Sequence, residues 1–216
     1  MKKIRIPENL TTRAYRAIKT HILEGNLDEN TRLTEESLSQ QLGISKSPIR
    51  EALTRLESER LIQIEPRRGA FLRRFSLEEI SDLYEVREAL EVHAVGHVKL
   101  TPELLAELRE SVEHSRKCLE ANDKPGYIEE DVNFHTLLAD ATGNALLAEM
   151  LTNLQHQVWL FRRKTYDLSR SKAFAIHAAI VEALERGDQE RAQRLMRRHI
   201  SEVREKLLHH LEEQAR

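Results

Sequence analysis

The chain has 216 residues, a formal net charge of −2 and one cysteine, Cys118. A single cysteine excludes an internal disulfide and a multi-cysteine metal site, and it favours a reducing compartment such as the cytoplasm. The sequence contains no apolar run of about eighteen residues, and its N-terminal lysines are not followed by an apolar segment, so neither a membrane span nor a signal peptide is expected. Abundant charged residues, with only 7 glycines and 5 prolines, predict a mainly α-helical protein.

The charge is divided unevenly along the chain. Residues 1–75 contain 15 Lys and Arg against 10 Asp and Glu, a net charge of +5, whereas residues 76–216 contain 19 against 26, a net charge of −7. A basic first part and an acidic second part suggest two domains, 1–75 and 76–216, with different partners. The alternative is charge scattered over the surface without functional meaning.

The first domain is predicted to contain three helices and a β-hairpin. Apolar periodicity indicates helices over about 10–24, 35–42 and 47–59, and alternation indicates strands over 61–65 and 70–74. Ser47 is predicted to cap the third helix, and Pro48 to be its first residue, where a missing N–H costs nothing.

The second and third helices have the spacing of a helix-turn-helix motif, whose second helix enters the major groove of DNA with its N-terminal end. At that end, the hydroxyls of Ser45 and Ser47 can donate to phosphate, as can free backbone N–H groups. Lys46 and Arg50 lie within one turn and can reach phosphate or the O6/N7 edge of guanine. The hairpin tip, Arg67-Arg68-Gly69, is typical of a wing that approaches a groove. The alternative is that these residues only cap the helix and face solvent, but the wing and the charge of +5 favour DNA binding.

The second domain is predicted to be an all-α, antiparallel bundle of six helices. Ser76 and Glu79 form a capping box that opens the first helix, and Gly143 and Gly187 separate later ones. The predicted helices cover about 77–98, 102–121, 125–141, 145–168, 171–186 and 188–213.

Four residues of this bundle are predicted to hold a divalent metal ion. Asp131 and His135 are four residues apart on one helix, so both side chains leave the same face. His177 and His199 are equidistant from the turn at Gly187-Asp188, and such residues lie at the same height in an antiparallel helix pair. Three imidazoles and one carboxylate suit Zn, with Ni or Mn as alternatives.

Chance spacing is the alternative explanation for this set. The chain has 10 histidines, and they also form the pair His93 and His97, which has no obvious acidic partner on its helix face.

Several stretches of the first domain form a long and specific string: Ile22-Leu-Glu-Gly25, Arg32-Leu33, Leu38 to Gly43, Ser45 to Leu53, Leu56-Glu57 and Pro66 to Ala70. This string resembles the winged helix of the GntR family of bacterial transcriptional regulators. The resemblance implies a homodimer on a palindromic operator in double-stranded DNA, contacted by the tip of the third helix, the wing and Arg32. The sequence departs from the family at two positions. Glu36 aligns with an arginine that some members use to read a base, and Lys46 stands where arginine is common, which weakens bidentate reading of guanine.

The second domain carries a further pattern, with Asp131-Val-Asn-Phe-His135 followed by Ala139-x-x-Thr-Gly-Asn144 and then by His177 and His199. It resembles the FCD ligand-binding domain of the FadR subfamily, and the six predicted helices are similar to its VanR-type branch. The resemblance implies that the four residues bind the metal and that a small carboxylate effector binds at it.

Three residues are candidates for contacts with this effector. Arg87 and Glu91 fit a recurrent Arg-x-x-Leu/Ala-Glu stretch of the family, and a guanidinium can grip a carboxylate with two hydrogen bonds. The alternative for Arg87 is a surface or interface salt bridge with Glu91. Trp159 and Arg162 are candidates to line the pocket, with a core position as the alternative for Trp159.

Together these features predict a ligand-responsive, metal-containing transcriptional regulator, with repression as its expected effect, and not an enzyme. The alternative is a metal-dependent hydrolase in which the Asp/His site activates water. No separate general base is evident for it, and the basic winged helix would be unexplained. A third hypothesis is a scaffold with a purely structural metal.

Overall fold

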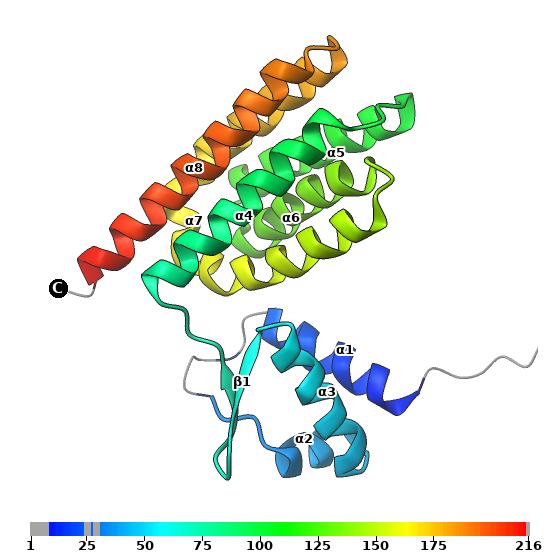
Figure 1. The fold of residues 1–216 in the computed structure, drawn as a ribbon, viewed down its shortest axis with the longest axis vertical. Helices are drawn as coiled ribbons and strands as arrows, with labels where there is room; N and C mark the ends of the chain where they lie inside the picture. The colour runs from blue at the N-terminus through cyan, green and yellow to red at the C-terminus, as the bar shows by residue number, and fades with distance from the viewer. Residues whose placement is uncertain (1–8, 24–26, 28–30, 215–216) are drawn as a thin grey trace, which may run out of the picture. The chain divides into compact units, whose positions relative to one another are not determined.

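The computed structural model describes residues 9–23, 27 and 31–214, without the side chains of 162–165 and 167–172 (Figure 1). Contacts between Cα atoms divide the chain into two compact units, Met1–Arg74 and Phe75–Arg216. The first unit contains α1 (Leu10–Leu23), α2 (Glu35–Leu42), α3 (Lys46–Ser58), β1 (Ile62–Glu65) and β2 (Gly69–Leu72). The second contains α4 (Leu77–Gly96), α5 (Pro102–Glu120), α6 (Lys124–Asp140), α7 (Ala145–Glu185) and α8 (Gln189–Gln214). The predicted class, a winged helix-turn-helix followed by an all-α part, is confirmed.

The core of the first unit lies between α1 and α3, which pack against each other. Ile18 and Ile22 of α1 and Ile49 and Leu56 of α3 are buried, as their helical spacing predicts. A polar cluster adds to this contact: the Tyr15 hydroxyl lies 2.6 Å from Glu59 Oε1, and Lys19 Nζ lies 2.6 Å from Glu59 Oε2. The cluster ties the first helix to the end of the third.

The third helix starts two residues earlier than predicted. Ser45 is its N-cap residue and Lys46 its first helical residue, so Pro48 occupies the third position rather than the first. This register is possible because none of the first helical N–H groups has an intrahelical partner, so proline is tolerated throughout the first turn. Pro48 is buried, so its ring also contributes to the core.

The hairpin pairs β1 with β2 in antiparallel register from Ile62↔Leu72 to Glu65↔Gly69. Leu33, just before α2, extends it by exchanging two hydrogen bonds with Ala70, at 2.8 and 2.9 Å. Gly69 has φ of 106°, and a Cβ there would lie 2.9 Å from the Leu33 carbonyl oxygen. Only glycine fits this position, where the wing meets the segment that leads into α2.

The second unit contains five helices among its described residues, not six. The predicted helices 145–168 and 171–186 form one continuous helix, α7. No glycine or proline interrupts residues 145–185, so nothing in this stretch forces the hydrogen-bond ladder to end. Figure 1 shows that the two ends of α7 run in different directions, and the last part lies beside α8.

The predicted capping box of the second unit is confirmed, and further helices begin with side-chain caps. Ser76 and Glu79 form the capping box of α4, Thr101 caps α5, and Asn144 caps α7. The core joins α4, α7 and α8 through residues such as Val95, Ile180 and Met196, all fully buried. No helix within the described part of the chain is long and apolar enough to span a membrane. This packed bundle holds the polar cluster described below.

Candidate metal centre and nucleic-acid interface

The tip of α3 presents the predicted contact residues to solvent. Ser45, Lys46, Ser47 and Arg50 are all exposed. The Ser45 side chain makes no capping hydrogen bond, so its hydroxyl is not used by the helix. The Ser47 hydroxyl makes only a long contact of 3.4 Å with Glu51. Both hydroxyls therefore remain available as donors to an external acceptor.

Both cations of the tip are ion-paired with the first turn of α2. Arg50 donates from Nε to Glu35 Oε1 at 2.8 Å and from Nη2 to Glu35 Oε2 at 2.7 Å. Lys46 pairs with Glu36 through a single contact. Hydrogen bonding from Arg50 lowers the pKa of Glu35, and Lys46 does the same for Glu36. The tip is therefore a group of four charges in which two carboxylates balance two cations.

The wing and Arg32 add a second cationic edge in the first unit. Arg67 and Arg68 are exposed in the turn between β1 and β2. Arg67 has φ of 65°, and Arg68 pairs with Glu65 at the end of β1. Arg32 is also exposed, and its Nε would lie 3.2 Å from a Cβ at Gly69. The absence of a side chain at Gly69 thus lets Arg32 lie against the wing.

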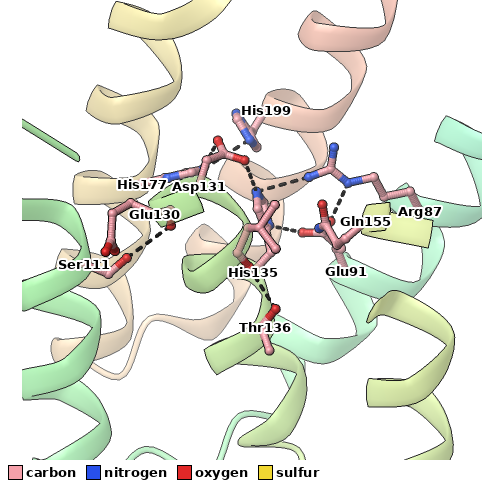
Figure 2. Close-up of polar contacts among 11 residues, drawn as sticks. Arg87, Glu91, Ser111, Glu130, Asp131, His135, Thr136, Gln155, His177 and His199 are labelled. Carbon is pink, nitrogen blue, oxygen red and sulfur yellow. Dashed lines mark hydrogen bonds and ion pairs between the residues drawn. The ribbon is translucent and has the colours of Figure 1, made fainter. Parts of the chain in front are cut away.

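The second unit brings the four predicted metal ligands together. Asp131 and His135 come from α6, His177 from α7 and His199 from α8, and the four side chains point toward one another (Figure 2). All are buried, and their ligand atoms lie within 4.8 Å of one another. The distance between His177 Nε2 and His199 Nε2 is 3.2 Å. The prediction that the two histidines meet across the turn is confirmed.

The His135 ring is held from both sides. Its Nδ1 contacts Glu91 Oε2, and its Nε2 lies 3.9 Å from Asp131 Oδ2 and 3.1 Å from Arg87 Nη2. A carboxylate beside Nδ1 favours a proton on that atom, and the Nε2 lone pair then faces Arg87 and Asp131. Burial lowers the pKa of His135 despite the attraction of Glu91, so the ring is neutral near pH 7.

The other two histidines are held by burial and by ring packing. Burial, together with His177, His135 and Arg87, holds the pKa of His199 well below its usual value. The His177 ring stacks on Phe134, with centroids 4.1 Å apart and planes 10° apart, so its orientation is fixed by packing. A neutral imidazole of fixed orientation is the form that coordinates a divalent ion.

Arg87 forms the salt bridge with Glu91 that was the alternative to effector binding, but the pair is buried rather than at the surface of the chain. Its Nε donates to Glu91 Oε1 at 2.5 Å, and Gln155 Nε2 donates to the same oxygen at 3.0 Å. Burial alone would raise the pKa of Glu91, but Arg87 and His135 hold it well below its usual range. Figure 2 shows this network beside the four ligands.

Two polar atoms of the same network have no hydrogen-bond partner among the described residues: Arg87 Nη1, a donor, and Gln155 Oε1, an acceptor. Since buried polar atoms are normally paired, both are candidates to bind a ligand.

Of the two other predicted effector contacts, the structure describes the side chain of Trp159. Trp159 is half-buried and packs against a cluster of Tyr127, Ile128 and Tyr166. The side chain of Arg162 lies outside the described residues.

Two family models match the sequence. The model of bacterial regulatory proteins of the gntR family matches residues 10–72, and the FCD domain model matches residues 82–202, more than half of the chain. The chain belongs to the GntR family. It is similar to the HTH-type transcriptional repressor RspR of Escherichia coli (strain K12), with 26% identity over 195 residues that cover 88% of this chain and 86% of that protein.

The chain is also similar to a second regulator and to a solved structure. An HTH-type transcriptional regulator in the TAR-I ttuE-ttuC' intergenic region of Agrobacterium vitis is 34% identical over 134 residues, which cover 59% of this chain and 78% of that protein. The solved structure of E. coli McbR/YncC has a TM-score of 0.80 at 24% identity and covers 97% of this chain and 100% of that chain, a likeness of fold. This GntR-family chain is therefore a DNA-binding transcriptional regulator with an FCD effector domain, and not an enzyme.

Proposed function

We propose that this protein is a repressor that binds a palindromic operator as a homodimer and responds to a small carboxylate. In this proposal a divalent metal ion, with zinc as the first candidate, is held by Asp131, His135, His177 and His199. The convergence of these four buried side chains on one point carries the proposal. The protein would act in the cytoplasm, where the DNA of a bacterium lies.

The donor set and its spacing fit a metal ion. With bond lengths near 2.0–2.1 Å, neighbouring ligand atoms of a tetrahedral zinc site are about 3.3 Å apart. The two Nε2 atoms of His177 and His199 are 3.2 Å apart, close to this value, and the ligand atoms of all four residues lie within 4.8 Å of one another. An ion bound by these four residues would supply positive charge, and an anionic oxygen would join it as a fifth ligand.

The charge of the site also favours a cation. Arg87 and Glu91 balance each other at 2.5 Å, and burial keeps His135 and His199 neutral. The carboxyl group of Asp131 lies among the three imidazoles and is only 3% exposed. A buried carboxylate is costly unless a cation compensates it, so a divalent ion among the three imidazoles stabilises this arrangement.

The carboxylate effector is supported by Arg87 and Gln155. The Nη1 of Arg87 is a buried cationic donor without a partner among the described residues, and a carboxylate oxygen is its natural acceptor. Gln155 Oε1 is a matching acceptor without a partner, so a ligand that also carries a hydroxyl or amino group would satisfy both. The hydrolase alternative receives no support, because the relatives are regulators.

Fragments of genomic DNA captured by the full-length protein test this function. We expect enrichment of a short palindrome and a steep fall of affinity with added salt, because cations at the tip of α3 and at the wing displace counterions from phosphate. Capture of fragments without a shared sequence, or binding that is insensitive to salt, would contradict the proposal.

A further inference from the structure

We infer that Glu35 is a positioning residue for DNA recognition: it holds the Arg50 guanidinium so that the edge formed by Nη1 and Nη2 faces a guanine in the major groove. This inference rests on the proposed function, because it concerns how the winged helix reads its operator. It gives a role to a carboxylate that would otherwise only weaken the attraction to DNA.

The geometry of the ion pair supports this role. A guanidinium has two edges that can make paired hydrogen bonds, one through Nε and Nη2 and the other through Nη1 and Nη2. Glu35 occupies the first edge with both oxygens, at 2.8 and 2.7 Å. The edge formed by Nη1 and Nη2, at the end of the side chain, is left for another acceptor. Two parallel N–H groups on this edge match the O6 and N7 acceptors of guanine.

Arg50 is more exposed than Glu35, as is required of the residue that contacts DNA. The Glu35 side chain is 33% exposed, whereas that of Arg50 is 67% exposed, so the carboxylate is the sheltered partner and the guanidinium is presented outward. Glu35 is the first residue of α2, whose start is fixed by the Thr34 side chain accepting from Ser37 N. The carboxylate is thus anchored to a capped helix end.

The neighbouring pair has a different geometry. Lys46 and Glu36 make one contact and are 52% and 60% exposed, so neither is sheltered. An ammonium group has no edge to orient, and this pair therefore affects binding through charge alone. Glu36 provides the matched control for Glu35: it lies on the same turn, carries the same charge and pairs with the other cation of the tip.

The experiment compares full-length wild-type, Glu35→Gln and Glu36→Gln proteins on two duplexes at one salt concentration. One duplex is the palindrome that the wild-type protein enriches, and the other is a scrambled sequence of the same length. A third series replaces each guanine of a half-site, one at a time, by 7-deazaguanine, which lacks the N7 acceptor.

For the wild type, we expect one guanine per half-site at which 7-deazaguanine weakens binding at least about fivefold. Glu35→Gln should abolish this sensitivity, weaken operator binding about tenfold and strengthen binding to the scrambled duplex severalfold. Glu36→Gln should strengthen binding to both duplexes by a similar factor and keep the sensitivity. Glu35→Asp, which keeps the carboxylate, should retain part of the sensitivity to 7-deazaguanine. Circular dichroism checks that each variant is folded.

Three results would overturn the inference. The first is a Glu35→Gln variant with wild-type sensitivity to 7-deazaguanine, and the second is equal shifts for the two glutamine variants on both duplexes. The third is a wild-type protein that responds to no single guanine, which would indicate that Arg50 binds phosphate. If the wild type enriches no palindrome at all, the proposed function fails, and the inference fails with it.

Discussion

Replacing Lys46 and Arg50 together by alanine is expected to weaken operator binding at least about 100-fold at physiological salt. Each protomer of the proposed dimer loses two cations from the tip of α3, so the complex loses four. A bidentate arginine–guanine contact accounts for about 1–3 kcal/mol of discrimination per half-site. Loss of the phosphate contacts of Lys46 should also lower the slope of log affinity against log salt by roughly one unit per protomer.

The double variant also weakens binding in a second way, because it removes the partners of Glu35 and Glu36. Without its two partners, the first turn of α2 presents Glu35 and Glu36 as unbalanced negative charges. These carboxylates would then repel the DNA backbone. Binding should therefore fall further than the loss of contacts alone predicts.

Fluorescence anisotropy with the enriched operator measures this effect, and a second pair of arginines supplies the control. Arg194 and Arg198 on α8 are exposed and form i,i+4 pairs, with side chains 64% and 58% exposed. Changing both to alanine removes the same charge from the second unit, and we expect less than a threefold change. Equal losses for the two double variants would mean that net charge, rather than the tip of α3, governs binding.

The second large effect is expected at the candidate metal centre. His177→Ala/His199→Ala should lower the bound metal from about one ion per chain to none, because two of the four ligands are lost. In the wild type, an ion present at 1,000 times its dissociation constant stabilises the folded state by about 4 kcal/mol. Chelation should therefore lower the melting temperature by roughly 8–16 °C.

Elemental analysis gives the metal content, and the fluorescence of Trp159 follows unfolding of the second unit because it is the only tryptophan of the chain. His93→Ala/His97→Ala is the matched control. His93 lies on α4 and His97 is the C-cap residue of this helix; both are exposed, and their rings stack with centroids 4.0 Å apart. This variant should keep the ion and the response to chelator. Unchanged metal content in the His177/His199 variant would exclude the site.

Local signals predicted most elements of the fold. Caps such as Thr34, Ser76 and Asn144 act on the residues beside them, so the sequence shows where those helices begin. The start of α3 was misplaced by two residues because Ser45 and Ser47 are equally good caps, and burial of Pro48 depends on α1, which is distant in sequence. The break predicted near residue 169 was wrong because polar residues alone do not end a helix.

The meeting of the four candidate ligands was predictable because both of their pairs follow simple geometry. Asp131 and His135 share a helix face, and His177 and His199 are equidistant from a turn. Their surroundings were harder to predict. Arg87 and Glu91 suggested a surface pair, although they continue the buried stripe of Ile80 and Tyr84, and this was the signal that could have placed them inside.

The partners that come from other helices could not be found in this way. Gln155 of α7 reaches Glu91, and Glu35 of α2 reaches Arg50, across 64 and 15 residues of sequence. Such contacts depend on how helices pack, which the pattern within one helix does not contain. Each of these two contacts orients a candidate site residue that the sequence had already indicated.

We propose that the cluster of Asp131, His135, His177 and His199 governs how the tip of α3 binds DNA. Titration of the enriched operator with metal-loaded protein, with and without a panel of small carboxylates, tests it most directly. We predict that at least one carboxylate changes the operator dissociation constant by roughly 5- to 150-fold, a typical coupling between two sites. The response should disappear after chelation and in the His177→Ala/His199→Ala variant. An effector response that survives both treatments, or an operator affinity that no member of the panel changes, would contradict the account.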